Sequence, residues 1–361
     1  MLIAVGSYTP KTEPGIYLYQ LDPDAEEFDL LKVIAGVENP SYLAVSAKGD
    51  TLFAIRENKE GDEGQLSSYL IADEDIAFKE SKTYEGGGSC FITTDSDSQY
   101  AFIANYGSGT LAVLKLSDDA SISAKQLIKF TGSGPNSDRQ DKSHIHAAVL
   151  SPDERFLYCT DLGADRLYRF RFNANAAKSL VPDEPHYINL PPGSGPRHMT
   201  FDRSGRWLYV LSELSGEIFR FSVKMPLTTW LQQVTIVSES YKGEVAAGDI
   251  TVHPAGKVLY ASLRGEANEI VSFRIDQRNG KLTFFQRISV EGSSPRSLAI
   301  SEDGKMLLAA NEKSNNITMF RISPDGKLKY KGKELKVAKP ACIKFIHDNN
   351  REEMKVANKA S

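Results

Sequence analysis

Hydrophobic and polar residues alternate along this chain in pairs of short stretches, and each pair encloses a polar turn of the Asp/Gly type. Such pairs recur about every fifty residues, and the clearest copies begin at Pro40, His146, Pro196, Gly248 and Pro295. Alternation with a period of two predicts a strand, and two such stretches around a tight turn predict an antiparallel hairpin. A hairpin repeated at this spacing is typical of a solenoid or a β-propeller.

One turn position aligns all the copies, and it lies just before the second stretch of each pair. The intervals between successive copies are 45 to 56 residues, close to the length of a four-stranded propeller blade. The longest interval contains a polar insertion, Gly132 to His144, which predicts a long loop. The aligned turn residues are Gly49, Ser98, Glu154, Gly205, Gly256, Gly304 and, in a degenerate seventh copy, Asn349.

The seventh copy has no strong second strand, and the N-terminus supplies one. Leu2 to Tyr8 predicts a strand without a hairpin of its own, and a second strand follows from Gly15 to Asp22. Pairing these strands with the last hairpin would close the ring and leave no open sheet edge. We therefore predict an all-β fold, a seven-bladed β-propeller of four-stranded antiparallel blades. It is expected to form a single domain over residues 1–350, followed by a charged tail, 351–361, that frays.

Composition narrows the class of protein. The net charge of −4 gives no support to a nucleic-acid or anionic-membrane partner, and no apolar run is long enough for a membrane span. The first residues, MLIAVGSYTP, lack the features of a signal peptide, so we expect a cytoplasmic protein, monomeric or weakly self-associating. The three cysteines, Cys90, Cys159 and Cys342, form no CxxC motif, which favours reduced, buried thiols.

Unusual polar residues gather at one end of the predicted hairpins, eight residues before and eight residues after the turn. Because equal distances from a hairpin turn lie side by side, both sets are expected on one face of the disc, as exposed strand ends. With the first strand innermost, they ring the mouth of the central channel. The first set is Ser41, Cys90, His146, Arg197, Gly248, Arg296 and Ala341, and the second is Glu57, Tyr106, Leu162, Glu213, Arg264 and Glu312.

Longer motifs around these residues resemble the seven-bladed propeller lactonases, which include propeller-type 6-phosphogluconolactonases and fungal carboxymuconate-lactonizing enzymes. The most specific segments are HIHAAVLSPDERFLYCTDLGADRLYRF from His144 and GSGPRHMTFDRSGRWLYVLSELSGEIFRF from Gly193. Supporting segments are GSYTPKTEPGIYLYQLD, NYGSGTLAVLKL, AAGDITVHPAGKVLYASLRG and GSSPRSLAISEDGKMLLAANEKSNNITMF. They span nearly the whole chain in order. The resemblance implies hydrolysis of a sugar lactone in the pentose phosphate pathway, without a cofactor.

The same resemblance implies four catalytic residues, and the hairpin alignment selects the same four: His146, Arg197, Glu213 and Arg264. Two neighbours depart from the family pattern, since Ser212 and Leu263 each replace an Asn. An imidazole has an ordinary pKa near 6.5, so His146 is a plausible general base, and Glu213 is expected to orient it or to take the proton itself. The two arginines suit an anionic substrate group or a developing oxyanion.

Further residues of the two sets are candidates for substrate binding. No GxSxG motif supports a covalent serine route. The pair His144 and His146 would place two imidazoles on one side of a strand, but no obvious third ligand accompanies them, so no metal site is predicted. His198 is expected to face away from Arg197 and to support the site from behind. The substrate-binding candidates are Arg296, Glu57, Tyr106, His144, His198 and Glu312.

Other functions remain open from the residues alone. A lactonizing cycloisomerase of the carboxymuconate type would use the same set of Arg, His and Glu side chains, with an internal carboxylate in place of water as the attacking group. A non-catalytic binding platform would call for an aromatic, uncharged mouth or a broad apolar patch. A calcium-dependent propeller lactonase would need carboxylate and Asn oxygens without paired arginines. The charged mouth favours an enzyme that takes a small anionic lactone.

Overall fold

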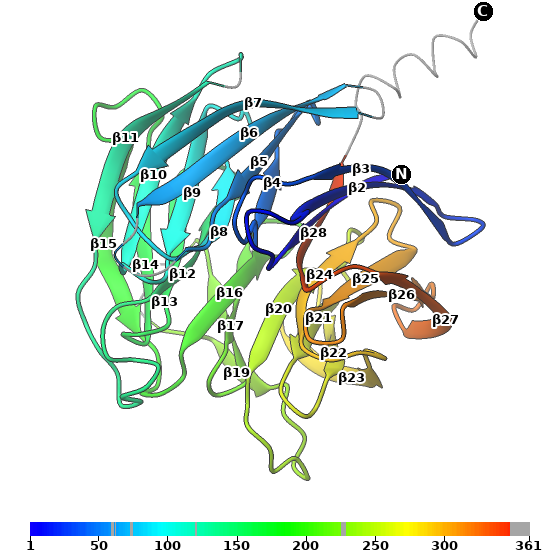
Figure 1. Cartoon of the computed structure of the whole chain (residues 1–361). Helices are drawn as coiled ribbons and strands as arrows, with labels where there is room; N and C mark the ends of the chain where they lie inside the picture. The colour runs from blue at the N-terminus through cyan, green and yellow to red at the C-terminus, as the bar shows by residue number, and fades with distance from the viewer. Residues whose placement is uncertain (59–60, 62, 73–74, 120, 225–228, 347–361) are drawn as a thin grey trace, which may run out of the picture.

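A computed structural model describes residues 1–58, 61, 63–72, 75–119, 121–224 and 229–346. These residues form seven four-stranded antiparallel sheets, arranged around a common centre (Figure 1). The described part of the chain holds no helix long and apolar enough to cross a membrane. The tail 351–361 and the seventh turn residue, Asn349, lie outside the described residues. The predicted fold class is therefore confirmed.

Each sheet is one blade, and the blades are numbered here from the N-terminus. From the innermost to the outermost strand, blade 1 consists of β28 (Pro340–Ile346), β1 (Leu2–Ser7), β2 (Ile16–Asp22) and β3 (Glu27–Ile34), and blade 2 of β4 (Leu43–Val45), β5 (Thr51–Ile55), β6 (Gly64–Ala72) and β7 (Asp75–Tyr84). In the same order, blade 3 consists of β8 (Ser89–Thr94), β9 (Tyr100–Asn105), β10 (Thr110–Leu116) and β11 (Ile122–Lys129), blade 4 of β12 (Ile145–Leu150), β13 (Phe156–Asp161), β14 (Arg166–Phe172) and β15 (Leu180–Asn189), and blade 5 of β16 (Pro196–Phe201), β17 (Trp207–Ser212), β18 (Glu217–Ser222) and β19 (Gln232–Thr235). Blade 6 consists of β20 (Ala247–Val252), β21 (Val258–Leu263), β22 (Glu269–Ile275) and β23 (Leu282–Ser289), and blade 7 of β24 (Pro295–Ile300), β25 (Met306–Asn311), β26 (Asn316–Ile322) and β27 (Leu328–Lys336).

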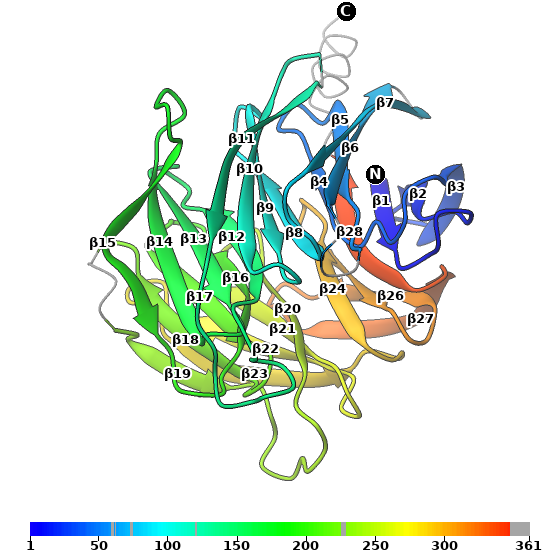
Figure 2. The same ribbon diagram turned by 60° about the vertical axis from the view of Figure 1, so that its left-hand side comes forward.

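The ring closes through strands from the two ends of the chain. β28 pairs antiparallel with β1, so the seventh hairpin combines the last strand with the first (Figure 2). This closure is the one that the sequence predicts, and it removes the edges that an open array of blades would expose. The first strand of every repeat is innermost, because β4, β8, β12, β16, β20, β24 and β28 contact one another in succession around the centre (Figure 2).

The core lies between neighbouring blades. The third strands contribute large aromatic side chains to it, and Phe170, Phe219, Phe273 and Phe320 are all fully buried. Each of them stands at an apolar position of an alternating stretch, which is why the binary pattern predicts the strands well. The blades are thereby held rigidly, and the inner strands present their ends to a fixed geometry.

The turns confirm the sequence alignment residue by residue. All six described turn residues have a left-handed backbone, with φ values between 52° and 76°. Four are glycines, which adopt this conformation readily, whereas Ser98 and Glu154 adopt it despite their side chains. In each turn the backbone N–H of this residue donates to the carbonyl oxygen three residues earlier, as in Gly205 to Asp202 at 2.9 Å.

A β-bulge changes the predicted pairing at the mouth of the channel. In blade 4, Ile145 pairs with Asp161 and Ala147 pairs with Thr160, so His146 is an extra residue without a ladder partner. The same shift occurs at Cys90, Arg197 and Arg296. The backbone N–H of the residue eight positions after the turn therefore donates to the carbonyl oxygen of the residue ten positions before the turn. The sequence alignment places it beside the residue eight positions before the turn instead. The two sets still share one face, and the bulge re-aims the side chains.

Candidate functional site

The ends of the second strands form a sevenfold set of equivalent positions. In every blade the residue at the end of the second strand donates its backbone N–H to the carbonyl oxygen of the residue ten positions before the turn. In blade 5, for example, Glu213 N donates to Gly195 O at 2.7 Å. The sequence alignment finds six of the positions. The seventh is Tyr8, whose N–H donates to Lys339 O at 3.0 Å through the ring closure. It was missed because its hairpin partner lies at the other end of the chain.

Glu213 is the centre of the site, and three arginines surround its carboxylate. Its Oε2 accepts from Nη1 of Arg197 at 2.6 Å and lies 3.0 Å from Nη2 of Arg264. Its Oε1 accepts from Nη2 of Arg139 at 2.7 Å. The predicted catalytic residues Arg197, Glu213 and Arg264 are thus brought together, with their side chains only 3%, 4% and 12% exposed. They are not the exposed strand ends that the sequence suggests, because the two guanidinium groups and the carboxylate pack against one another.

The electrostatics of the cluster keep Glu213 ionised. Burial raises its pKa, but the charges of Arg264, Arg197 and Arg139 outweigh burial and hold the pKa well below the ordinary value of 4.5. For Arg264, burial is the larger influence and lowers its pKa to about 10, although Glu213 acts in the opposite direction. Glu213 therefore organises the arginines and is a poor proton acceptor.

His146 lies against the same cluster. Its Nε2 accepts a hydrogen bond from Nη1 of Arg197 and is 3.9 Å from Oε2 of Glu213. Since a guanidinium has no acceptor, neutral His146 carries its proton on Nδ1, which lies 3.8 Å from Sγ of Cys90. Burial, aided by the charge of Arg197, lowers the pKa of His146 well below 6.5. The ring is therefore neutral near pH 7, and its lone pair faces the arginine.

Arg139 belongs to the cluster although no sequence pattern points to it. It comes from the long insertion before His144, and its side chain is 37% exposed, more than those of Arg197 and Arg264. Gln140 braces this loop, because its Nε2 donates to Leu162 O and to Oδ1 of Asp165, both at 2.8 Å. The only signal in the sequence was the position of the insertion, directly before a site strand, since loops carry no periodicity.

A second polar group lies beside the first. Oε2 of Glu57 accepts from the hydroxyl of Tyr8 at 2.6 Å and lies 4.0 Å from Nη2 of Arg296. The guanidinium of Arg296 lies over the Tyr8 ring, 4.9 Å from its centroid. Glu312 lies close enough to influence the pKa values of Arg296 and Arg264. The candidates Glu57, Arg296 and Glu312 thus share one end of the ring with Glu213.

His144 and Tyr106 form one wall of the site. Their rings stack with centroids 4.3 Å apart, and the edge of His146 faces the Tyr106 ring at 5.5 Å. Both ring nitrogens of His144 are already bonded, one to Tyr106 O and one to Oδ1 of Asp141, each at 2.9 Å. His144 therefore holds the wall in place rather than offering a free nitrogen to a metal. Among the described residues, no group of three or more His, Cys, Asp or Glu side chains has metal-site geometry.

The expected orientation of His198 is wrong. The bulge at Arg197 breaks the strand alternation, so His198 also turns toward the channel. Its ring lies 5.2 Å from that of His146 in blade 4, 5.9 Å from Tyr42 in blade 2 and 5.4 Å from Phe91 in blade 3. His198 therefore forms a second layer directly next to the cluster, with a hydrogen bond from Nδ1 to Oδ1 of Asp249 at 2.8 Å.

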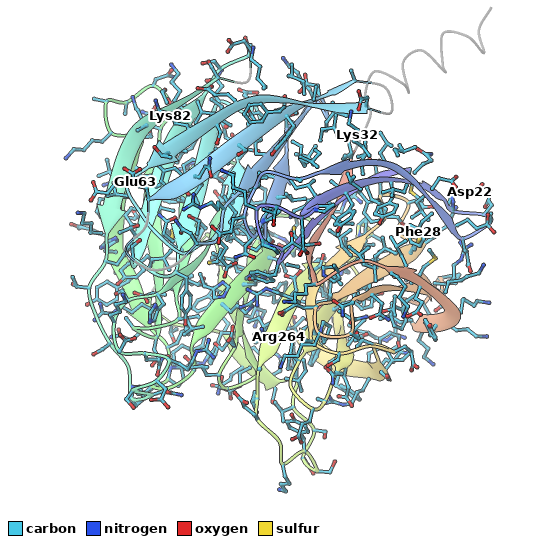
Figure 3. The ribbon with its side chains drawn as sticks, in the orientation of Figure 1. Asp22, Phe28, Lys32, Glu63, Lys82 and Arg264 are labelled. Carbon is cyan, nitrogen blue, oxygen red and sulfur yellow. The ribbon has the colours of Figure 1, made fainter. Side chains whose placement is uncertain are left out.

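The cluster occupies the middle of the disc. In Figure 3, the labelled Arg264 lies toward the centre of the ring, whereas Asp22 and Lys32 of blade 1 lie at its outer edge. Three grooves lie elsewhere, between blades at the hairpin turns, and one of about 770 Å³ is lined by Asp153, Arg155 and Gly205 among others. Those grooves lie at the turn ends of the strands, where none of the predicted site residues is found. The chemistry is therefore assigned to the central cluster.

The family follows from a comparison of the whole chain. A family model described as lactonase, seven-bladed β-propeller, matches residues 2–345. The chain belongs to this family. A 6-phosphogluconolactonase of Bacillus subtilis is 30% identical over 349 residues, covering 95% of this chain and 97% of its own. The predicted enzyme class, a lactonase, is thereby confirmed.

Solved structures agree with this membership. A candidate 6-phosphogluconolactonase of Bacteroides fragilis superposes with a TM-score of 0.89 and 31% identity, over 96% of this chain and 98% of its own. The periplasmic gluconolactonase of Pseudomonas aeruginosa gives a TM-score of 0.89 and 30% identity, over 96% and 99%. Since one similar lactonase is named as periplasmic, the cytoplasmic location of this chain stays a prediction, as does its oligomeric state.

The two buried imidazoles lead to a first testable prediction. Burial lowers the pKa of His198 to about 4, and that of His146 also lies well below 6.5. Below pH 6.5 the unfolded chain binds protons that the folded chain excludes, so stability should fall as the pH falls from 6.5 toward 4. Each group contributes up to about 1.4 kcal/mol per pH unit. The groups facing these rings are Arg197, Arg296, Glu213 and Asp249.

NMR titration of the histidine rings measures this directly. The resonances of His146 and His198, assigned from His146→Gln and His198→Gln variants, should stay those of a neutral ring at pH 5.5. Urea unfolding at several pH values supplies the matching slope of stability. A midpoint near 6.5 for either ring would contradict the prediction.

Proposed function

We propose that this lactonase hydrolyses an anionic sugar lactone, and that its substrate is 6-phospho-D-glucono-1,5-lactone, which it opens to 6-phosphogluconate in the pentose phosphate pathway. One observation carries the proposal. The Glu213 cluster and the polar group beside it together hold four arginines and three glutamates. These side chains therefore carry an excess of positive charge in a chain of net charge −4. The arginines are Arg139, Arg197, Arg264 and Arg296, and the glutamates are Glu57, Glu213 and Glu312. The names of the related 6-phosphogluconolactonase and gluconolactonase both support a sugar lactone as the substrate, and the first of them supports the phosphate.

The arginines suit two tasks in such a reaction. Arg197 and Arg264 are nearly buried, and donors in a site shielded from water stabilise a developing oxyanion strongly. Nε of Arg264 has no acceptor among the described residues, so this buried N–H is available to a substrate oxygen. Arg139 is the more exposed arginine on Glu213, and Arg296 lies beside Glu57, so these two suit the anionic group at the other end of the substrate.

The proton acceptor is proposed to be His146. The sequence leaves His146 and Glu213 open, but a carboxylate that already accepts from two arginines and pairs with a third is a weak base. The lone pair on Nε2 of His146 faces Arg197 in the free enzyme. When the lactone carbonyl oxygen draws the guanidinium of Arg197, this lone pair is released at the place where water attacks.

The reaction then balances without any further reagent. The oxygen of a water molecule bonds to the lactone carbonyl carbon, and one water proton passes to His146. The carbonyl oxygen takes the negative charge and is stabilised by the arginines. Collapse of this intermediate breaks the bond between the carbon and the ring oxygen, and the ring oxygen takes the proton back from His146. The product is the open hydroxy acid.

A direct assay tests the substrate. The phosphorylated lactone is generated in situ, its spontaneous opening is subtracted, and Arg197→Ala serves as a variant with a disabled site. A wild-type rate well above background, lost in the variant, is expected. No rate on this lactone, with turnover of an unphosphorylated aldonolactone or of a muconolactone, would overturn the phosphosugar assignment and keep the enzyme class. The muconolactone outcome would favour the cycloisomerase.

Arg139 supplies a second prediction about specificity. It is the most exposed arginine on Glu213, and it comes from a loop rather than from a strand. Arg139→Ala should therefore raise KM for the phosphorylated lactone about 10- to 100-fold, the value of one charge-assisted hydrogen bond, and leave kcat nearly unchanged. KM for unphosphorylated glucono-1,5-lactone should change little.

Steady-state kinetics on the two lactones separate the outcomes. Arg278→Ala is a matched control, because Arg278 is 91% exposed and lies in a turn outside the cluster. An equal change of KM for both lactones would show that Arg139 does not distinguish the phosphate. A fall in kcat alone would show that it acts on the reacting carbonyl instead.

A further inference from the structure

A buried imidazole–carboxylate pair lies next to the arginine cluster, and none of the steps above uses it. Nδ1 of His198 lies 2.8 Å from Oδ1 of Asp249, and the side chains are 4% and 10% exposed. Oδ2 of Asp249 accepts from the backbone N–H of Leu298 at 2.9 Å. The pair therefore joins blades 5, 6 and 7, and the orientation of the His198 ring is fixed by a charged partner.

These bonds determine which nitrogen of His198 carries the proton. Burial raises the pKa of Asp249, but the hydrogen bond from His198 and two backbone donors outweigh it and lower the pKa, so Asp249 is ionised. An ionised Asp249 only accepts, so Nδ1 must donate. Neutral His198 then carries a lone pair on Nε2.

The lone pair on Nε2 has no protein donor. This atom is buried and finds no hydrogen-bond partner among the described residues. The rings of Tyr42, Phe91 and His146 surround the imidazole from three other blades, with centroids between 5.2 and 5.9 Å away. A buried acceptor without a donor is unfavourable by about 1–3 kcal/mol. Buried polar atoms of this kind in folded proteins are usually satisfied by an ordered water molecule.

The position of His198 places such a water beside the reacting groups. His198 directly follows Arg197 in β16, and its ring is the neighbour of His146 in the channel. Arg197 itself bonds to His146 and to Glu213. A water on Nε2 would therefore lie next to both Arg197 and His146.

We propose that His198 and Asp249 form a water-binding pair, in which Nε2 of His198 accepts a hydrogen bond from the water that attacks the lactone carbonyl. The assignment rests on the proposed lactone hydrolysis. His198 is a positioning residue in this scheme, because it holds one O–H of the water while the other proton passes to His146. Asp249 acts through His198, since it keeps the lone pair on Nε2 rather than on Nδ1.

Two variants of His198 separate positioning of water from a purely structural role. His198→Asn keeps a donor near Nδ1 for Asp249 but has no atom at the position of Nε2. His198→Gln extends its amide to the position of Nε2 and offers an oxygen acceptor there. We expect His198→Asn to lower kcat about 10- to 100-fold with KM within about twofold of wild type, the effect of a misplaced reactant. We expect His198→Gln to recover kcat to within about fivefold of wild type.

Thermal unfolding of both variants monitors the fold, and the tautomer of His198 in the wild type is read from its ring nitrogen shifts. Cross-relaxation between Hε1 of His198 and a slowly exchanging water is expected in the free enzyme. Wild-type kcat in His198→Asn would overturn the positioning role. So would an equal loss in His198→Gln.

The water contact also separates this inference from the proposed function. If the wild type opens none of the lactones but the contact is observed, the proposed hydrolysis fails and the water site stands. If the lactone is hydrolysed but His198 carries its proton on Nε2, or no water contact is found, the inference fails and the hydrolysis stands.

Discussion

Replacing Glu213 by glutamine is expected to abolish lactone turnover and to lower the free energy of unfolding by about 3–5 kcal/mol, the effect of removing one partner from a buried ion pair. Glutamine keeps the size of the side chain but removes the charge. Three guanidinium groups, from Arg139, Arg197 and Arg264, would then face one another without the carboxylate between them.

The loss of activity has the same origin as the loss of stability. Glu213 holds Arg197 and Arg264 on one of its oxygens and Arg139 on the other, so it sets the distances between the groups that grip the substrate. Without it, like charges repel and the guanidinium groups turn away from one another. The site then loses the fixed donors on which stabilisation of an oxyanion depends.

Urea unfolding and steady-state kinetics measure the two effects on the same preparation. Glu312→Gln is the matched control for stability, because Glu312 occupies the equivalent position in blade 7 and is only partly buried. Its free energy of unfolding should change by less than about 1 kcal/mol. If Glu213→Gln is as stable as Glu312→Gln, the carboxylate does not organise the arginines.

The pH dependence of the free energy of unfolding is an independent test of the contribution of ionised Glu213. The pKa of Glu213 is lowered in the folded protein, so its contribution is complete above the ordinary Glu pKa and is lost as the pH falls through the lowered value. The wild type should therefore lose this contribution progressively below the ordinary Glu pKa, and completely only in strong acid. Glu213→Gln should lack that part of the acid dependence.

The fold was predictable because it depends on patterns that repeat. Each hairpin carries its own alternation and its own turn, and six left-handed turn residues, from Gly49 to Gly304, stand where the alignment puts them. Ring closure was also predictable, since the last repeat lacked the strand that the N-terminus has in excess. Regular strands need no information beyond the local pattern.

The site was predictable in part. The four residues implied by the family motifs and the hairpin positions meet around one carboxylate. Arg139 could not be found, because a loop has no period and its course depends on contacts of Gln140 with blade 4. His198 was placed on the wrong side, because alternation does not foresee a bulge at Arg197. Both errors concern positions where the chain departs from regular structure.

Replacing His146 by glutamine is the second large effect that we expect, with a loss of about 10²–10⁴ in kcat if this ring is the general base. Glutamine keeps an acceptor for Nη1 of Arg197 near the position of Nε2 but takes no proton at neutral pH. KM should change little, because the arginines and Glu213 remain in place. The fold should also persist, since the substitution adds no charge to the buried cluster.

The control is His253→Gln. His253 lies in a hairpin turn, where its ring bonds to Gly304 O at 2.8 Å and to the N–H of Ala255 at 3.0 Å, so kcat should stay within about twofold of wild type. Pre-steady-state kinetics then show whether the slow step of His146→Gln is the chemical one. A loss of less than tenfold in kcat would show that His146 is not the general base. Since Glu213 is ionised and held by three arginines, the proton would then have to pass to the second imidazole, His198, through the water on its Nε2.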